Sequence, residues 1–250
     1  MTRFRMLLCG ISILVALQFA TAADPPARRS VANAPYGKKL RWAVGIYEGT
    51  SPTELAPSKT ITNPIFTIHG INRFDSDVRK MVAVHIFDPF VTRHENKHYM
   101  FFELCGFTNF KYSCDIAYAS SDDGLKWSYE GIILDEPFKL SYPNVFQHGD
   151  HYYMVPESNQ DASVLLYQAV EFPEKWKLVK KLLTGRAFQD PTIFHYQDKW
   201  WILATPGGNA HLSLYFADSL TGPWKEHPQS PIVANNGHIA RPAGRVIFRG

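Results

Sequence analysis

The sequence predicts an all-β fold, a β-propeller built from four-stranded antiparallel blades. Two observations lead to this fold class. A unit of about fifty residues recurs along the chain, and its copies are FDPFVTRHENKHYMFFE, SYPNVFQHGDHYYMVPE and QDPTIFHYQDKWWILAT. Each unit also divides into four short strand-like runs. A period of this size indicates one supersecondary unit repeated radially or linearly, and four strands per unit are typical of a propeller blade.

The repeat is clearest when the copies are aligned on proline. Pro89, Pro143 and Pro191 are separated by 54 and 48 residues, and a fourth start at Arg241-Pro242 follows 51 residues later. Three further sets of positions keep step with the prolines: Tyr99, Tyr153 and Trp201; Glu103, Glu157 and Thr205; and Trp127, Trp176 and Trp224. Large aromatic side chains at a repeated interior position usually serve burial, so we expect the repeated Trp and Tyr residues to pack between blades.

The second copy shows the four strands most plainly. Its predicted strands are 142–147, 151–157, 163–170 and 176–183, and the breaks between them are HGD, SNQDA and EFPEK. Turn-forming residues between runs of aromatic and β-branched residues are the usual signal of hairpins. The segments 114–127 and 212–224 match the third strand of this copy, and each ends in a turn before the repeated Trp.

The N-terminal region differs in composition from the repeats. Arg3 and Arg5 precede an apolar run that ends in Ala20-Thr21-Ala22, which predicts a secretory signal over residues 1–22, cleaved near Ala22. Residues 23–40 mix Pro, Ala and basic residues without a hydrophobic period and predict a flexible tether. We therefore expect a secreted or periplasmic protein whose propeller occupies residues 41–250, with no membrane span beyond the signal segment.

Charge and cysteine content narrow the classes of partner. The chain has 26 Lys and Arg against 23 Asp and Glu, and removing Arg3 and Arg5 with the signal leaves 24 against 23. Nucleic acid is not an expected partner, since its binding requires a basic surface. Cys105 and Cys114 lie between the second and third predicted strands of the first repeat, where they could form a disulfide or remain reduced. Two thiols are too few ligands for zinc.

The repeated polar residues form a candidate site. The first strands start with Asp88, Tyr142, Asp190 and Arg241, and the second strands end with Glu103, Glu157 and Thr205. Hairpin geometry places the start of a first strand and the end of the second at the same edge of a blade, so these side chains should meet at the axial mouth of the propeller. Carboxylates gathered in one pocket raise one another's pKa. Alternatively, Asp before Pro caps a turn and Glu at a strand end is simply solvated.

Several long motifs resemble a known family. WAVGIYEGTSP, SSDDGLKWSYEGIILDEPFKLSYPNVF, YYMVPES and HIARPAGR are similar to the five-bladed propeller at the N-terminus of plant glucosamine inositolphosphorylceramide transferases and their bacterial relatives. The resemblance implies five blades, of which about four are present here, with the last one, after Arg241, incomplete at the C-terminus. In that family the sugar-transfer chemistry belongs to a separate glycosyltransferase domain.

A more distant resemblance connects the chain to the arabinanase, levansucrase and invertase superfamily, including glycoside hydrolase family 43. Those hydrolases use an Asp in the first blade, an Asp two blades later and a Glu acid in the following blade. Asp88 and Asp190 match the first two positions. The third falls near HIARPAGR, which offers His238, Arg241 and Arg245 but no Glu. Without a proton donor, glycosidic cleavage lacks one of its two carboxyl groups.

Two functions follow. In the first, the propeller recognises a saccharide or glycoconjugate at the axial mouth, with Glu103, Tyr142, Arg241 and Arg245 binding it. In the second, it is a glycoside hydrolase or transglycosidase in which Asp88 and Asp190 act with Glu157 or His238 as the acid. We expect no cofactor, with a calcium ion on the propeller axis as the alternative.

Overall fold

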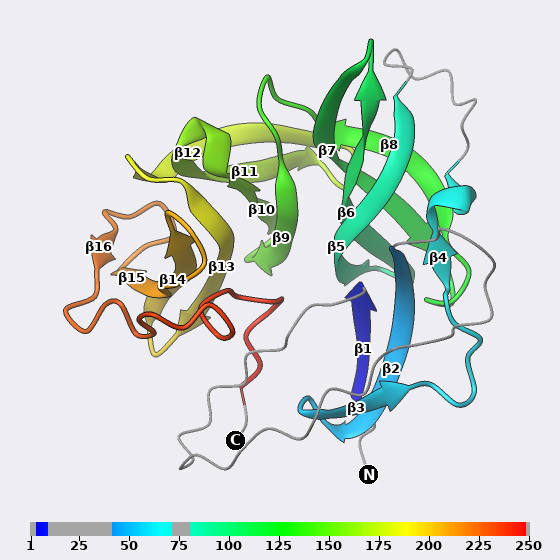
Figure 1. Ribbon diagram of the computed structural model, residues 1–250, viewed down its shortest axis with the longest axis horizontal. Coiled ribbons are helices and arrows are strands. Elements are labelled where there is room, and N and C mark those ends of the chain that lie inside the picture. The colour runs from blue at the N-terminus through cyan, green and yellow to red at the C-terminus, as the bar shows by residue number, and fades with distance from the viewer. Residues whose placement is uncertain (1–3, 10–41, 72–80, 249–250) are drawn as a thin grey trace.

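The structure is a computed structural model that describes residues 4–9, 42–71 and 81–248. It is an all-β fold of four antiparallel four-stranded sheets, here named blades 1 to 4 in chain order. Figure 1 shows the four blades arranged around a common centre. The described residues contain no helix long and apolar enough to cross a membrane.

The strands occur in the same order in blades 2, 3 and 4, with each strand paired to the next. Blade 2 contains β5 (Val82–His94), β6 (Lys97–Thr108), β7 (Lys111–Ser121) and β8 (Ser128–Leu134). Blade 3 contains β9 (Ser141–His148), β10 (His151–Ser158), β11 (Ser163–Glu171) and β12 (Lys175–Thr184), with the 3-10 helix η2 (Asn159–Asp161) between β10 and β11. Blade 4 contains β13 (Phe188–Tyr196), β14 (Lys199–Pro206), β15 (Ser213–Ala217) and β16 (Lys225–Glu226).

Blade 1 is less regular. Its strands are β1 (Phe4–Cys9), β2 (Ala43–Ser51), β3 (Glu54–Pro57) and β4 (Phe66–Thr67), followed by the 3-10 helix η1 (Ile68–Gly70). Strand β2 pairs with β1, β3 and β4. Strand β1 falls within the predicted signal segment, and the predicted tether, residues 23–40, lies outside the described residues.

The predicted strands of blade 3 agree with the observed strands to within one residue at every end. The prediction of five blades was wrong for the described residues, which form four. Residues 43–67, which lie outside the recognised repeats, form most of blade 1. The predicted fourth repeat start at Arg241-Pro242 begins no strand. The polar groups around Arg241 bond to blades 3 and 4 and not to a partner strand of their own.

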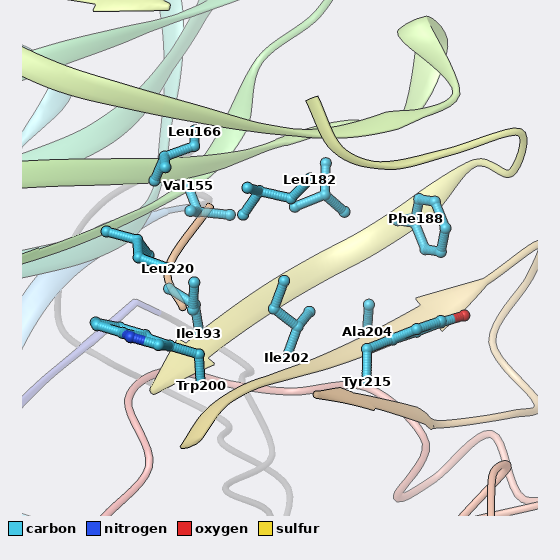
Figure 2. Packing of buried hydrophobic residues seen from close by; sticks show 11 residues of the cluster. Val155, Leu166, Leu182, Phe188, Ile193, Trp200, Ile202, Ala204, Tyr215 and Leu220 are labelled. Atoms are coloured by element: carbon cyan, nitrogen blue, oxygen red, sulfur yellow. The ribbon is translucent and has the colours of Figure 1, made fainter. Parts of the chain in front are cut away.

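Three hydrophobic cores lie between neighbouring blades. The core between blades 3 and 4 contains Val155 and Leu166 from one side and Ile202 and Trp200 from the other (Figure 2). The adjacent residues Met154 and Leu165 belong instead to the core between blades 2 and 3. Because successive side chains of a strand point to opposite faces, a strand buried on both faces is apolar at nearly every position. This explains runs such as VLLY, which show no alternation.

The repeated tryptophans pack as the sequence predicts. Trp127, Trp176 and Trp224 are partly buried, and each packs against one of the three cores. Each indole also donates its Nε1–H to a backbone carbonyl three or four residues earlier, at distances of 3.1, 2.8 and 3.3 Å. Each repeat therefore retains both the burial of the ring and the hydrogen bond that orients it.

Candidate acidic site

The first strands of blades 2, 3 and 4 share an unusual backbone conformation where the site begins. Asp88, Tyr142 and Asp190 have φ angles of 48°, 46° and 49°, in the left-handed region that non-glycine residues rarely adopt. Each precedes a proline, and in each blade the pairing between the first two strands shifts register at this point. Proline has no N–H that could donate to the neighbouring strand. The proline and the residue before it therefore form a β-bulge in the first strand. In each of the three blades, the bulge turns one polar side chain out of the regular alternation of the sheet.

The ends of the second strands lie beside these bulges. Glu103 pairs with Phe87, Glu157 with Ser141 and Thr205 with Gln189, and each of these partners directly precedes a bulge residue. Hairpin geometry thus places Glu103 next to Asp88, Glu157 next to Tyr142 and Thr205 next to Asp190. The name acidic cluster is used below for Asp88, Glu103, Glu157 and Asp190.

Arg241 connects two members of the acidic cluster from different blades. Its Nε and Nη2 lie 2.7 and 2.6 Å from Oδ2 of Asp190, and its Nη2 lies 3.9 Å from Oε2 of Glu157. The same Glu157 oxygen accepts the backbone N–H of Asp190 at 2.8 Å, and its Oε1 accepts from Asn159 Nδ2 at 2.9 Å. Asp190 and Glu157 are 6% and 5% exposed. Glu157 therefore accepts two N–H donors and lies near the guanidinium of Arg241.

Glu103 and Asp88 occupy the other half of the cluster. Glu103 is buried, and its Oε1 lies 3.0 Å from Nζ of the half-buried Lys139. Burial raises the pKa of Glu103 to about 7, against the lowering effect of Lys139. Burial, followed by the charge of Glu157, raises the pKa of Asp88 to about 6, with Arg241 and Lys139 acting in the opposite direction. Burial and the same Glu157 charge raise the pKa of Asp190 well above its ordinary value.

The segment after residue 239 is attached at several points beside the cluster. Thr205 Oγ1 donates to the carbonyl of Ala240, and Arg245 Nη2 donates to the carbonyl of Val145 at 2.6 Å. The hydroxyl of Tyr142 accepts the N–H of Gly244 at 2.6 Å and lies 2.8 Å from Thr192 Oγ1. In Figure 1 this segment, drawn in red, passes beside β9 and β13. Tyr142 thus uses its hydroxyl to hold this segment, which carries Arg241.

The remaining predicted residues, His238, Cys105 and Cys114, are not members of the acidic cluster. His238 is exposed, and its backbone N–H donates to the side-chain oxygen of Asn236 at 3.1 Å. Cys105 and Cys114 are a cross-strand pair in β6 and β7 and form a disulfide. Their sulfur atoms lie within 4.8 Å of a Glu103 oxygen, but disulfide sulfur is not the thiolate that binds metals, so this group does not make a metal centre.

Sequence reasoning did not identify Lys139 or Asn159. Lys139 lies three residues before Tyr142, and the equivalent positions before Asp88 and Asp190 are His85 and Ala187. A position that changes between His, Lys and Ala inside a repeated framework is the same signal that singled out Asp88, Tyr142 and Asp190. It was available in the sequence, but only the structure shows that Lys139 reaches Glu103.

The raised pKa of Glu103 predicts how stability varies with pH. The folded chain holds a proton on Glu103 up to a pKa of about 7, whereas the unfolded chain releases it near the ordinary value of 4.5. Between these pH values the folded state binds more protons, so its stability falls as pH rises. In Glu103→Gln the loss of unfolding free energy between pH 5 and pH 7 should therefore be smaller than in the wild type, by on the order of 1–2 kcal/mol. This figure is below the full value because Lys139, the partner of Glu103, is partly exposed to solvent. Urea unfolding at a series of pH values measures this.

The matched control for this prediction is Glu95→Gln, which changes an exposed glutamate outside the cluster. Its stability profile should keep the wild-type slope. An unchanged slope in Glu103→Gln would mean that Lys139 keeps Glu103 ionised throughout this pH range.

The structure is a β-propeller that carries a buried cluster of acidic side chains, and the propeller fold is also found among glycoside hydrolases. An exo-β-1,3-galactanase from Clostridium thermocellum is 14% identical, with a TM-score of 0.57 over 74% of this chain and 42% of that chain. A family 117 glycoside hydrolase from Zobellia galactanivorans is 20% identical, with a TM-score of 0.51 over 60% and 57% of the two chains. At these identities the similarity establishes the fold alone.

Sequence comparison places the chain more narrowly. Residues 37–249 match the family described as glucosamine inositolphosphorylceramide transferase 1, N-terminal, and the chain belongs to this family. Glucosamine inositolphosphorylceramide transferase 1 of Oryza sativa subsp. japonica is 34% identical over 245 residues, covering 90% of this chain and 32% of the relative. The Arabidopsis thaliana protein of the same name is 32% identical, covering 83% and 29%. The chain thus spans about a third of the length of the curated relatives it matches.

Proposed function

We propose that this domain binds a saccharide at the acidic cluster without cleaving it. The observation that carries the proposal is the bonding of Glu157 and Asp190. Asp190 is bound by Arg241, and Glu157 accepts two N–H donors. A general acid must carry a proton that it can release to the leaving group. Both carboxyl oxygens of Glu157 already accept N–H donors, an arrangement that suits Glu157 to accept further hydrogen bonds from sugar hydroxyls.

The cluster has the donors and acceptors that a sugar requires. An ionised carboxylate offers about four acceptor positions, and the contacts described above occupy only part of them. Lys139 supplies N–H donors beside Glu103, and Arg241 supplies them beside Asp190; both side chains remain about 40% exposed. A sugar hydroxyl both donates and accepts, so neighbouring hydroxyls can bond to a carboxylate and a cation together.

The balance of charge favours an amino sugar among saccharides. Four carboxylates face two cations, Arg241 and Lys139, so the fully ionised site has an excess of negative charge that an ammonium group would neutralise. The name of the family contains glucosamine, which is a sugar of this kind. We extend the proposal to glucosamine-containing glycans as the first ligands to test.

Calorimetric titration with glucosamine and with neutral N-acetylglucosamine at pH 5.5 and 7.5 tests the proposal. Glucosamine should bind more tightly at pH 7.5, because Asp88 and Glu103, with pKa values of about 6 and 7, are then more fully ionised. N-acetylglucosamine should show little pH dependence. Asp88→Asn should weaken glucosamine binding at pH 7.5 by roughly tenfold or more, as expected for a lost charge-assisted hydrogen bond.

The matched control is Asp218→Asn, which changes an exposed aspartate paired with Lys199. It should bind glucosamine like the wild type. Equal losses in both variants, or no binding of any saccharide by the wild type, would reject the proposal.

The second candidate function is a glycoside hydrolase, and one observation favours it. Asp88 and Glu103 have pKa values of about 6 and 7, the range in which a group works as a general acid or base near neutral pH. The acid would then be Glu103, in place of Glu157 or His238. Release of sugars from arabino- or β-1,3-galacto-oligosaccharides, lost in Glu103→Gln, would establish hydrolysis and overturn recognition without cleavage.

We also propose that the protein is exported. The apolar segment that ends at Ala22 supports this location, and so does the Cys105–Cys114 disulfide, since disulfides persist mainly in oxidising compartments. The expected result is an intact mass, for the protein recovered from the cell exterior, that lacks residues 1–22. The mature blade 1 then consists of β2, β3 and β4 without β1. Recovery of the uncleaved chain with the cells would contradict it.

A further inference from the structure

One face of blade 2 continues outward from the acidic cluster as a row of aromatic rings. In the strand register, Phe87 lies opposite Glu103, His85 opposite Cys105, and Phe107 opposite Tyr112. Since residues two apart on a strand share a face, Glu103, Cys105 and Phe107 all project on the same side of β6. The name aromatic strip is used below for Trp42, His85, Phe87, Phe107 and Tyr112.

The rings of the strip are in contact with one another. Ring centroids lie 4.9 Å apart for Trp42 and Phe87, 5.4 Å for His85 and Phe87, and 5.2 Å for Phe107 and Tyr112. His85 Nδ1 lies 3.4 Å from the hydroxyl of Tyr112. Phe107 and Tyr112 are 44% and 46% exposed, so the outer end of the strip presents ring surface to solvent.

The strip adjoins the acidic cluster. Phe87 directly precedes Asp88 in the chain and pairs with Glu103 across the ladder. At the outer end, burial raises the pKa of Tyr112, while the charge of Lys139 lowers it and the charge of Glu103 raises it. From Glu103 to Phe107 the strand extends about 13 Å, which is longer than a single sugar ring.

The hairpin that carries the outer rings is held rigidly. The Cys105–Cys114 disulfide joins β6 to β7 between Glu103 and the Phe107–Tyr112 pair. The two turn residues, Asn109 and Phe110, have φ angles of 50° and 64°, as in a two-residue type I′ hairpin turn. A surface that is already ordered loses little conformational entropy on binding.

We propose that the aromatic strip is a second saccharide subsite, which stacks against the sugar units that follow the one held by the acidic cluster. The ligand class is therefore an oligosaccharide or the glycan of a glycoconjugate. The inference rests on the proposed function. Exposed aromatic rings with polar groups between them provide apolar faces for sugar rings and hydrogen bonds for hydroxyls. His85 and the hydroxyl of Tyr112 supply these polar groups.

A lipid surface is the competing occupant of this hairpin. Phe110, at the tip of the turn, is fully exposed and would meet a membrane before the strip does. The strip itself lies along the flank of the hairpin, and its inner end meets the charged Glu103–Lys139 pair. Burying that pair in lipid would be costly, whereas the hydroxyls of a glycan can bond to both groups.

The test compares ligands of different length. Glucosamine-containing, arabino- and β-1,3-galacto-oligosaccharides of one to four units are titrated against the wild type and against Tyr112→Ala and Phe107→Ala. Binding of the tetrasaccharide that the wild type prefers should weaken about tenfold in each variant, as expected for a lost stacking contact. Binding of the single sugar should change less than about twofold, because the acidic cluster is intact.

Phe110→Ala is the matched control, because it removes an exposed ring from the same hairpin but outside the strip. It should bind every ligand like the wild type. Both strip residues under test are exposed, so the variants should fold, and their thermal unfolding verifies this. Sedimentation with vesicles of phosphatidylcholine and phosphatidylserine tests the lipid alternative.

The outcomes separate the inference from the proposed function. If Asp88→Asn abolishes binding while the strip variants bind all lengths normally, the second subsite is rejected and the proposed function stands. If the wild type binds no saccharide, both are rejected. Vesicle binding that is lost in Phe110→Ala and Tyr112→Ala alike, without glycan binding, would assign the hairpin to a lipid surface.

Discussion

Arg241→Ala should lower the free energy of unfolding by about 3 kcal/mol at pH 7.5. Arg241 is the counter-ion of Asp190 at 2.6 Å and approaches Glu157 at 3.9 Å, and both acids are nearly fully buried. Removing one partner of a buried ion pair leaves an uncompensated charge and typically costs about 3–5 kcal/mol. We take the lower end of that range because the Arg241 side chain is 41% exposed.

The loss should depend on pH in a defined direction. Without Arg241 the pKa of Asp190 rises further above its ordinary value, so the folded variant takes up a proton as the pH falls. A protonated Asp190 has no charge to compensate, and the deficit relative to the wild type should shrink from pH 7.5 to pH 5. Urea unfolding of both proteins at the two pH values measures it.

Two further variants test whether the loss of stability in Arg241→Ala comes from the unpaired charge. Adding Asp190→Asn to Arg241→Ala removes the unpaired charge and should recover part of the stability. Lys175→Ala breaks the exposed Lys175–Glu171 pair and should cost less than about 0.5 kcal/mol. A deficit in Arg241→Ala that is as small as in Lys175→Ala, or that is independent of pH, would show that the Arg241 bonds do not support the fold.

Loss of the disulfide is the second large effect we expect. Cys105 and Cys114 are nine residues apart, and constraint of an unfolded loop of this size is worth about 2–3 kcal/mol. The variant in which both cysteines are replaced by alanine should be less stable than the wild type by about this amount in urea unfolding. The buried position of both cysteines adds a packing loss when the sulfur atoms are removed.

Reduction of the wild type provides the control, because it breaks the bond without removing the sulfur atoms. Reduced wild type and the double alanine variant should lose similar stability, with the remaining difference reporting the packing loss. Equal midpoints for oxidised and reduced wild type would mean that the hairpin is held by its strand pairing alone.

Much of the fold could be predicted from the chain because the signals are local. Each of the three units contains an X-Pro start, aromatic strands and the repeated Trp. The hydrogen bonds of each Trp indole also stay within its own blade. The strands of blade 3 accordingly match their predicted ranges closely. Blade 1 shares none of these repeat markers, which is why residues 43–67 were not recognised as most of a blade. The fifth blade was expected from the family resemblance, with its start at Arg241-Pro242, where the structure has no strand.

The candidate site was predictable only in outline. Hairpin geometry within one blade places Glu103 beside Asp88 and Glu157 beside the start of β9, and this follows from the spacing of the residues. The bond between Asp190 and Arg241 crosses 51 residues of sequence, and the Glu103–Lys139 pair joins β6 to the loop before β9. No periodicity in the sequence encodes either pairing.

The amino-acid sequence alone specifies the repeating blade, its strand order, the tryptophans that pack between blades and the polar residue before each proline. These depend on alternation and turn chemistry, which operate over a few residues. Three features depend on the tertiary structure: the four blades formed by the described residues, the pairing of each cation with its carboxylate, and the aromatic strip that leads away from Glu103. The first two arise where separate blades and loops meet, and the contact of Trp42 with Phe87 completes the third. Long-range packing and electrostatics set all of them, at positions that no local pattern specifies.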